Sequence, residues 1–271
     1  MEQALGDRMK QWENAYRSVV EPHSYLMLRL DGRAFHTYTR GLSRPFDADL
    51  VAAMDATMVA LCEEIDGVRL AYCQSDEISL VVTDWRHGAP TPGNPTGLRL
   101  SEPWLGGVVA KILSISAAVA SVEFNDVRAG QGQRAGAVFD ARLWTFPGDE
   151  QGQAEVGNYL LWRQRDAIKN SVTMAASAVF SHRRLHGVNT DEKRRLLVEA
   201  GKPWEGLPAG YRQGRVAVRR PQVAAVTYVD KRDGAEKTIE VERHPFVIED
   251  APLVGDWIAD HIPEPPNREE G

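Results

Sequence analysis

The segment 68–82, VRLAYCQSDEISLVV, places a short polar tip between two apolar runs. Residues 68–73 and 78–82 have the length and the apolar composition of buried β-strands. Between them stand Ser75, Asp76 and Glu77. Adjacent carboxylates are costly to bury unless a positive charge lies on them. The segment therefore predicts a β-hairpin with carboxylates at its tip, which form either a solvated turn or part of a metal site.

The segments around this hairpin predict its place in a sheet. After an opening helix at 5–16, the patterns indicate a strand, a helix, the hairpin, a helix and a strand at 25–30, 47–65, 68–82, 105–127 and 136–147. Asp47 or Asp49 is expected to cap the first of these two helices. The order β-α-β-β-α-β is that of a ferredoxin-like sheet. It sets the end of the first strand beside the hairpin tip.

The rest of the chain divides by composition. Residues 86–103 are rich in Pro and Gly and are expected to form a mobile loop, whereas 155–182 are expected to be helical. A hairpin around Asp233 and Gly234 is predicted within 221–248. The tail IPEPPNREEG is expected to be disordered. We therefore expect an α+β fold in three parts: a ferredoxin-like domain at 1–150, a helical region with a hairpin packed on that domain at 151–250, and an acidic tail at 251–271.

Composition indicates an ordinary globular protein of a reducing compartment. The chain is 43% hydrophobic and 26% charged, and its two cysteines form no disulfide framework. We see no signal peptide and no apolar run of roughly 18 residues, so we expect a cytoplasmic protein without membrane contact. The net charge is −6, yet residues 161–221 hold thirteen Lys and Arg against five Asp and Glu. This local excess favours a polyanionic partner.

Carboxylates from two neighbouring strands are typical of a magnesium site. Asp31 ends the first strand, and Asp76 and Glu77 lie at the hairpin tip predicted beside it. Mg²⁺ takes oxygen ligands and keeps positions open for phosphate. Two such ions can activate an attacking oxygen and stabilise a leaving one. Polymerase palms and nucleotide cyclases work in this way on a ferredoxin-like sheet. A simple Asp-Gly turn and a solvated acidic tip remain the alternative.

Two stretches, RLDGRAFHTYTRGLSRPFDADL (29–50) and CQSDEISLVV (73–82), resemble the metal-site motifs of a known family. It comprises the tRNA-histidine guanylyltransferases and the related 3′–5′ RNA polymerases. Further stretches are similar to the family's later motifs in the same order: GDRMKQWENAY, VFDARLWTFP, NYLLWRQRDAIKNS, NTDEKRRLL and LPAGYRQGRVAV. The resemblance implies a nucleotidyltransferase that adds nucleotides to the 5′ end of tRNA, with 1–150 as a palm-like catalytic domain and 151–250 as a basic RNA-binding region.

The resemblance also implies a reaction scheme. ATP or GTP activates a 5′-monophosphate, and the 3′-hydroxyl of an incoming nucleoside triphosphate then attacks it, assisted by two Mg²⁺ ions. Where the histidine-specific members carry His-Ile-Asn-Asn, residues 168–171 of this chain read Ile-Lys-Asn-Ser. This departure favours templated tRNA 5′-end repair over addition of an extra G. Family members assemble as tetramers of paired dimers. The rival readings are a nucleotide cyclase and a catalytically inactive RNA-binding protein.

The family resemblance also implies site residues, at the positions where this sequence matches each motif. Asp31, the carbonyl of Gly32 and Asp76 would hold the metals, and Glu77 would support them as a catalytic residue. The family's nucleotide contacts map onto the backbone of Arg33, Ala34, Phe35 and His36, which would cradle the triphosphate, and onto Arg44, Asp47, Ser75 and Lys111. Phe46 stands where the family usually has Asn. Contacts with the tRNA backbone are expected from Arg163, Lys169, Lys193, Arg212 and Arg215.

Overall fold

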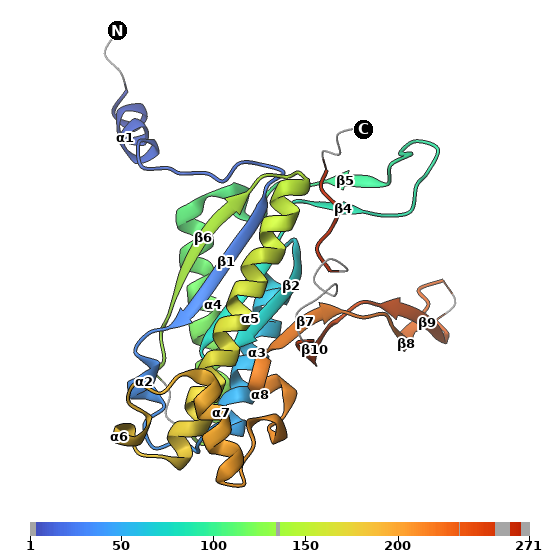
Figure 1. The fold of residues 1–271 in the computed structure, drawn as a ribbon. Helices are drawn as coiled ribbons and strands as arrows, with labels where there is room; N and C mark the ends of the chain where they lie inside the picture. The colour runs from blue at the N-terminus through green and yellow to red at the C-terminus, as the bar shows by residue number, and fades with distance from the viewer. Residues whose placement is uncertain (1–3, 134–135, 233, 253–260, 267–271) are drawn as a thin grey trace.

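A six-stranded antiparallel sheet forms the centre of the computed structural model, which describes residues 4–133, 136–232, 234–252 and 261–266 (Figure 1). The strand order is β10-β7-β2-β3-β1-β6. The strands are β1 (Tyr25–Gly32), β2 (Val68–Gln74), β3 (Glu77–Val82), β6 (Phe139–Phe146), β7 (Arg215–Arg219) and β10 (Phe246–Asp250). The order β2-β3-β1-β6, with a helix after β1 and another after β3, is the ferredoxin-like arrangement. The expected α+β palm is therefore confirmed.

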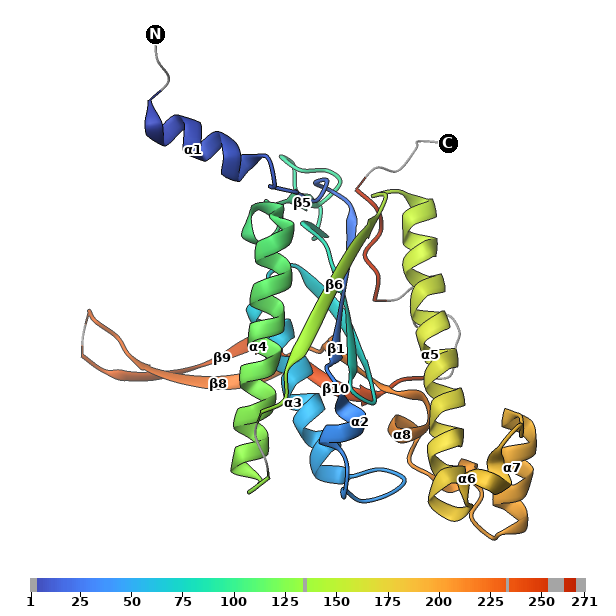
Figure 2. The ribbon, with the colours of Figure 1, turned by 90° about the vertical axis from the view of Figure 1, so that its left-hand side faces the viewer.

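Helices cover both faces of this sheet because β1 is apolar on both sides. Leu26, Leu28 and Leu30 join the core under α3 (Ala48–Glu64) and α4 (Val109–Gly130). Tyr25 and Met27 point to the opposite face, since successive side chains alternate along a strand. There they pack in the cluster that includes residues of the 30-residue helix α5 (Glu150–Val179). Figure 2 shows α4 and α5 on opposite sides of the strands.

The start of α3 is fixed by Asp47. Its carboxylate accepts hydrogen bonds from the amides of Leu50, at 2.9 Å, and Ser43, at 3.1 Å. Partial burial acts to raise the pKa of Asp47, but these hydrogen bonds outweigh it and hold the pKa below its usual range. Asp49 lies in the first turn instead. Of the two expected caps, Asp47 is the one that forms.

Asp47→Ala is expected to lower the free energy of unfolding by about 1 kcal/mol at neutral pH, as measured by urea unfolding. Because the pKa of this carboxyl is lowered in the folded state, its contribution is present above the unfolded pKa. The difference from wild type should therefore shrink as the pH falls through the folded pKa. Asp49→Ala is the matched control. An equal loss in both variants would show that charge near the helix start, and not capping, is responsible.

Two segments expected to be mobile or disordered are structured. Residues within 86–103 contribute to a small hairpin of β4 (Trp85–His87) and β5 (Leu98–Leu100). In the tail, the carbonyl of Pro263 accepts from the Tyr25 hydroxyl at 2.6 Å, and that of Glu264 accepts from the Trp85 indole at 2.9 Å. Buried aromatic N–H and O–H groups need such acceptors. The described tail residues 261–266 thus pack on the domain, while 267–271 lie outside the described residues.

The C-terminal half contributes to the same sheet as the N-terminal half. Strands β7 and β10 extend the edge beside β2, so the sheet contains strands from both sides of residue 150. The short helices lie near one end of the sheet: α2 (Phe35–Tyr38), α6 (His182–Leu185), α7 (Thr190–Glu199), α8 (Ala209–Gln213) and the 3₁₀ turn Trp204–Gly206. A second 3₁₀ turn, Trp104–Gly107, precedes α4.

Two elements project from the body (Figure 1). The strands β8 (Gln222–Val229) and β9 (Glu236–Arg243) pair as the predicted hairpin, although Asp233 at its turn lies outside the described residues. The hairpin extends away from the sheet in both views, which differs from the packed position that we expected. Helix α1 (Leu5–Asn14) has no buried residue. Among the described residues, no helix combines the length and apolar character required to cross a bilayer.

Candidate active site

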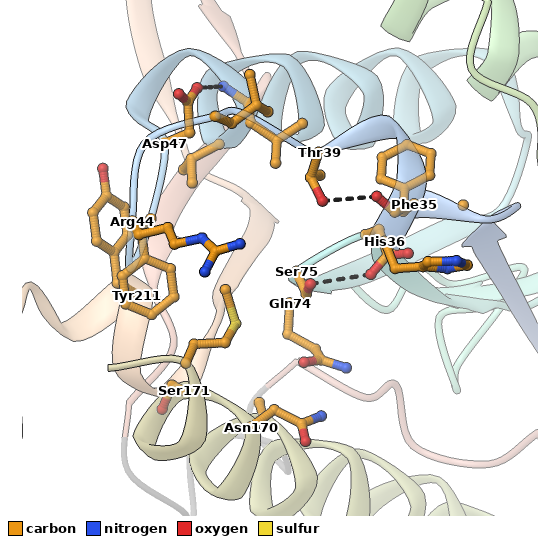
Figure 3. Close-up of a pocket in the computed structure, with 18 of the residues that line it drawn as sticks. Phe35, His36, Thr39, Arg44, Asp47, Gln74, Ser75, Asn170, Ser171 and Tyr211 are labelled. Atoms are coloured by element: carbon orange, nitrogen blue, oxygen red, sulfur yellow. Dashed lines mark hydrogen bonds between the residues drawn. The ribbon is translucent and has the colours of Figure 1, made fainter. Parts of the chain in front are cut away.

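A cavity of about 660 Å³ opens where β1 and the β2–β3 hairpin end. Figure 3 shows α3 along one side of it and α5 along the other. Its lining comes from the β1–α2 turn, the 39–51 segment, the hairpin tip, the C-terminal part of α5 and α8. The cavity thus joins segments that are distant in the sequence at the tip of the predicted hairpin.

Gly32 and Asp76 line this cavity, and Asp31 precedes Gly32 on β1, close enough for its charge to act on Asp76. Asp31 lies opposite Glu77 in the β1–β3 register, and the Gly32 amide donates to the carbonyl of Asp76 at 3.1 Å. Gly32 belongs to β1 and does not turn the chain. A Cβ on it would lie 2.2 Å from the Phe35 ring, so the close packing of that ring requires glycine. The structure therefore brings the first strand and the hairpin tip together as the topology predicted.

Negative charge accumulates around Asp76. Burial raises the pKa of Asp76, and the neighbouring carboxylates of Asp31 and Glu77 raise it further. The hydroxyl of Ser75 donates to Asp76 Oδ1 at 3.0 Å and partly opposes this effect. Ser75 itself has a positive φ of 51°, a conformation that is costly outside glycine and is often found at functional sites. A bound cation would relieve the repulsion between these carboxylates.

The donors at this edge fit Mg²⁺. Asp31 and Asp76 offer carboxylate oxygens and Gly32 offers a backbone carbonyl, all of the hard type that Mg²⁺ prefers. No group of three or more His, Cys, Asp or Glu side chains suited to a metal is found in the described ranges. The predicted set of two carboxylates and one carbonyl does not require such a group, because Mg²⁺ usually completes its shell with water and phosphate.

Glu77 is held by a buried arginine. Both of its carboxylate oxygens accept from Arg163 on α5 at 2.7 Å, and both residues are only 7% exposed. Arg163 also donates to Asp166 at 3.1 Å. Burial alone would lower the pKa of Arg163, but its carboxylate partners raise it. Glu77 therefore positions the hairpin tip against α5, and Arg163 does not have the surface position that we expected of an RNA contact.

The other predicted RNA contacts differ in their exposure. Arg215 is buried and forms an ion pair with Asp55 on α3, again unlike the expected surface position. Arg212 is partly buried: its guanidinium lies 5.1 Å from the centre of the Trp204 ring. Lys193 is also partly buried and donates to the Thr173 hydroxyl at 3.1 Å. Lys169 is the member of the set that is exposed, on α5 next to the cavity-lining Asn170.

The β1–α2 turn supplies the expected backbone cradle in shortened form. The amide of Arg33 already donates to the carbonyl of Val138 at 2.8 Å. Ala34 has a positive φ of 56°, which turns the chain into α2. The amides of Ala34, Phe35 and His36 lie at the start of this helix, where amides have no intrahelical acceptor. All three residues line the cavity, so this backbone is the structural candidate for a triphosphate cradle.

The side chains predicted to bind nucleotide separate into two groups. His36, Arg44, Asp47 and Ser75 line the cavity, and the Arg44 guanidinium points into it (Figure 3). Lys111 does not line it. It is exposed near the start of α4, whose first amide donates to the carbonyl of Ser18, just before β1 begins. Because Asp31 ends that strand, Lys111 lies at the opposite end of the sheet.

The structure adds cavity residues that the sequence did not single out. Gln74 precedes the hairpin tip, Asn170 and Met174 come from α5, and Tyr211 comes from α8. Each lies within or near a motif that resembles the family, but nothing in the local pattern indicates that its side chain faces a shared cavity. Only the packing of α5 and α8 against the hairpin end of the sheet brings them together.

Comparisons with known proteins agree with this site. The family model described as tRNAHis guanylyltransferase matches residues 6–147. The structure of a bacterial tRNA(His) guanylyltransferase-like protein in complex with ATP is 30% identical, with a TM-score of 0.76, and covers 96% of this chain and 99% of its own. A similar structure in complex with GTP is 31% identical, with a TM-score of 0.69, and covers 93% and 94%.

A curated relative supports the same conclusion. The probable tRNA(His) guanylyltransferase of Mus musculus is 25% identical over 264 residues, which are 90% of this chain and 82% of that protein. The family match covers β1, which carries Asp31, and the β2–β3 hairpin, which carries Asp76 at its tip. The chain therefore belongs to the tRNAHis guanylyltransferase family of nucleotidyltransferases.

Proposed function

We propose that this protein repairs the 5′ ends of tRNA by templated, Mg²⁺-dependent nucleotide addition in the 3′-to-5′ direction. The observation that carries the proposal is that β1, which carries Asp31, meets the hairpin tip at the Gly32–Asp76 hydrogen bond, and that Gly32 and Asp76 line a cavity of about 660 Å³. Protein pockets for small molecules are commonly of this size. The relatives solved with ATP and GTP support nucleoside triphosphates as the ligands.

In the proposed reaction, a 5′-phosphate oxygen of the RNA first attacks the α-phosphate of ATP or GTP, which releases pyrophosphate and joins the nucleoside monophosphate to the RNA. The 3′-hydroxyl of the incoming nucleoside triphosphate then attacks the activated 5′ phosphate and displaces the activating nucleotide. When bound, two Mg²⁺ ions would neutralise the phosphates and lower the pKa of the attacking hydroxyl. Asp31, Asp76 and the Gly32 carbonyl would hold the ions, and the amides of 34–36 with Arg44 would orient the triphosphate. Positioning and charge neutralisation supply most of the catalysis in such transfers.

Templated repair is favoured over addition of an extra G by the residues on α5. The segment 168–171 reads Ile-Lys-Asn-Ser, and the histidine of the specific members is absent from it. Asn170 and Ser171 line the cavity, so this departure lies at the proposed site itself. Exposed Lys169, beside them, is the proposed contact for the RNA backbone. We further propose that the protein assembles as a tetramer, as the family resemblance implies, and that it acts in the cytoplasm, as its composition suggests.

The test is an extension assay on tRNA that lacks its first 5′ nucleotide and carries a radiolabelled 5′-monophosphate. Enzyme, Mg²⁺, ATP and single nucleoside triphosphates are added, and the products are resolved by length. We expect extension only with the nucleotide complementary to the opposing base, and none after chelation of the metal.

Two other outcomes would contradict the proposal. Addition of G to full-length histidine tRNA regardless of template would establish a guanylyltransferase of the histidine-specific type. Conversion of ATP or GTP to a cyclic nucleotide without RNA would identify a cyclase on the same palm. The basic residues around α5 and α7 speak against the cyclase, which needs no polyanion surface.

A further inference from the structure

The cavity has a polar end and an apolar end. Asp76, Ser75 and the 34–36 backbone lie at one end, toward the strands of the sheet. Figure 3 shows Tyr211 across the cavity from Ser75 and His36, with the Arg44 guanidinium reaching into the space between them. Phe46 packs against Tyr211 on that side, and the cavity lining also includes the apolar side chains of Leu50, Val51 and Met174. A nucleoside triphosphate has the same division, with charge at one end and a flat, weakly polar base at the other.

Two aromatic rings pack against each other across the cavity from Ser75 and His36. The rings of Phe46 and Tyr211 lie 4.9 Å apart at 40° to each other, and both residues line the cavity. Phe46 comes just before the capped start of α3, and Tyr211 belongs to α8. Helix α8 is anchored from both sides, because Arg215 donates to the Gly210 carbonyl and Arg212 donates to the Leu207 carbonyl. Because both rings are held by neighbouring structure, little conformational entropy remains to be lost when a ligand binds.

We infer that Phe46 and Tyr211 form a stacking subsite for the base of a nucleoside triphosphate whose phosphates lie at the Asp76 end. The inference rests on the proposed function for the identity of the ligand. It assigns to Phe46 a role that the family resemblance does not supply, since the family usually has Asn at this position. Arg44, between the two ends, would contact the phosphates.

A stacking subsite makes a prediction about selectivity. Every base presents a π-face, so stacking tolerates changes of base identity and strengthens with ring size. ATP and GTP should therefore bind with similar affinity, and CTP and UTP more weakly. A subsite that reads hydrogen bonds would instead distinguish adenine from guanine strongly, because a mismatched base leaves buried polar groups unpaired.

The experiment is isothermal titration calorimetry of the full chain with ATP, GTP, CTP and inorganic tripolyphosphate, in the presence of Mg²⁺. The variants are Phe46→Leu, Phe46→Asn and Tyr211→Leu, and Tyr228→Leu on the projecting hairpin is the matched control. We expect each cavity variant to weaken ATP and GTP about tenfold, within the range measured for stacking of one base on an aromatic side chain. Tripolyphosphate should bind all four variants as it binds wild type, since it lacks a base.

The outcomes distinguish loss of base stacking from misfolding of the variant, and failure of the subsite from failure of the proposed function. Unchanged ATP affinity in Phe46→Leu and Tyr211→Leu would overturn the subsite. A parallel loss of ATP and tripolyphosphate binding would also overturn it, because the defect would then be structural. If ATP binding depends on the two rings but no RNA is extended, the proposed function fails and the subsite stands. If RNA is extended normally while both ring variants bind ATP like wild type, only the subsite fails.

Discussion

Asp76→Asn is expected to lower the rate of nucleotide addition by on the order of 10³-fold or more. The substitution keeps the size of the side chain but removes a carboxylate that lines the cavity. Without that charge, the proposed metal ions lose a ligand, and the charge on the phosphates is left without its counterions. Single-turnover extension of 5′-activated RNA measures the step directly, since it bypasses RNA activation.

The fold should survive this change. Burial and the carboxylates of Asp31 and Glu77 already disfavour the charged form of Asp76, as its raised pKa indicates. A neutral amide removes that repulsion, so the free energy of unfolding in the absence of divalent cations should be equal to that of wild type or higher. Asp49→Asn, an exposed acidic residue in the first turn of α3, serves as the control and should retain activity. Normal turnover of well-folded Asp76→Asn would exclude the proposed mechanism.

The second large effect is expected at Arg163. Arg163→Met should lower the free energy of unfolding by about 3–5 kcal/mol, because it leaves the carboxylate of Glu77 buried without its partner. Urea unfolding monitored by circular dichroism measures the loss. The same change should also reduce activity, since Arg163 ties the hairpin tip, and with it Asp76, to α5.

A double variant tests the cause of this loss. Arg163→Met combined with Glu77→Gln removes both charges of the pair, so much of the lost stability should return. No recovery in the double variant would show that packing of the arginine, and not its charge, is what stabilises the fold. Weaker RNA binding with unchanged stability in Arg163→Met would support the phosphate contact that the sequence suggested.

Several features of the fold followed from local patterns. The sequence shows the apolar runs of β1 and of the β2–β3 hairpin, and the amphipathic helix α3. In each of these segments, apolar residues recur in the pattern typical of a strand or a helix. Asp47 was recognisable as a cap because its side chain acts on an amide three residues away. The packing of the tail on the domain was not recognisable from the sequence. The acceptors that the tail offers to Tyr25 and Trp85 are backbone carbonyls, which every residue carries.

In the candidate site, too, some features followed from the sequence and others depended on tertiary contacts. The end of the first strand and the hairpin tip were predicted to meet because the order of strands implies their adjacency, and the structure pairs Asp31 with Glu77 and Gly32 with the carbonyl of Asp76. The roles of Arg163, Arg215 and Lys111 could not be predicted in the same way. Arginine at a given position looks identical in sequence whether it faces RNA or a buried carboxylate, and only the packing of α5 and α3 decides between them.

The sequence by itself determined the order of the four strands β1, β2, β3 and β6 with their two helices, and the carboxylates at the end of β1 and at the hairpin tip. These depend on side-chain periodicity and on motifs that span only a few residues. The tertiary structure alone decided which charges are paired in the interior, which end of the sheet carries Lys111, and which residues close the cavity around Phe46 and Tyr211. Those features arise from contacts between segments that are far apart in the sequence. Phe46 and Tyr211, for example, are separated by 165 positions, and such contacts form only when the whole sheet is assembled.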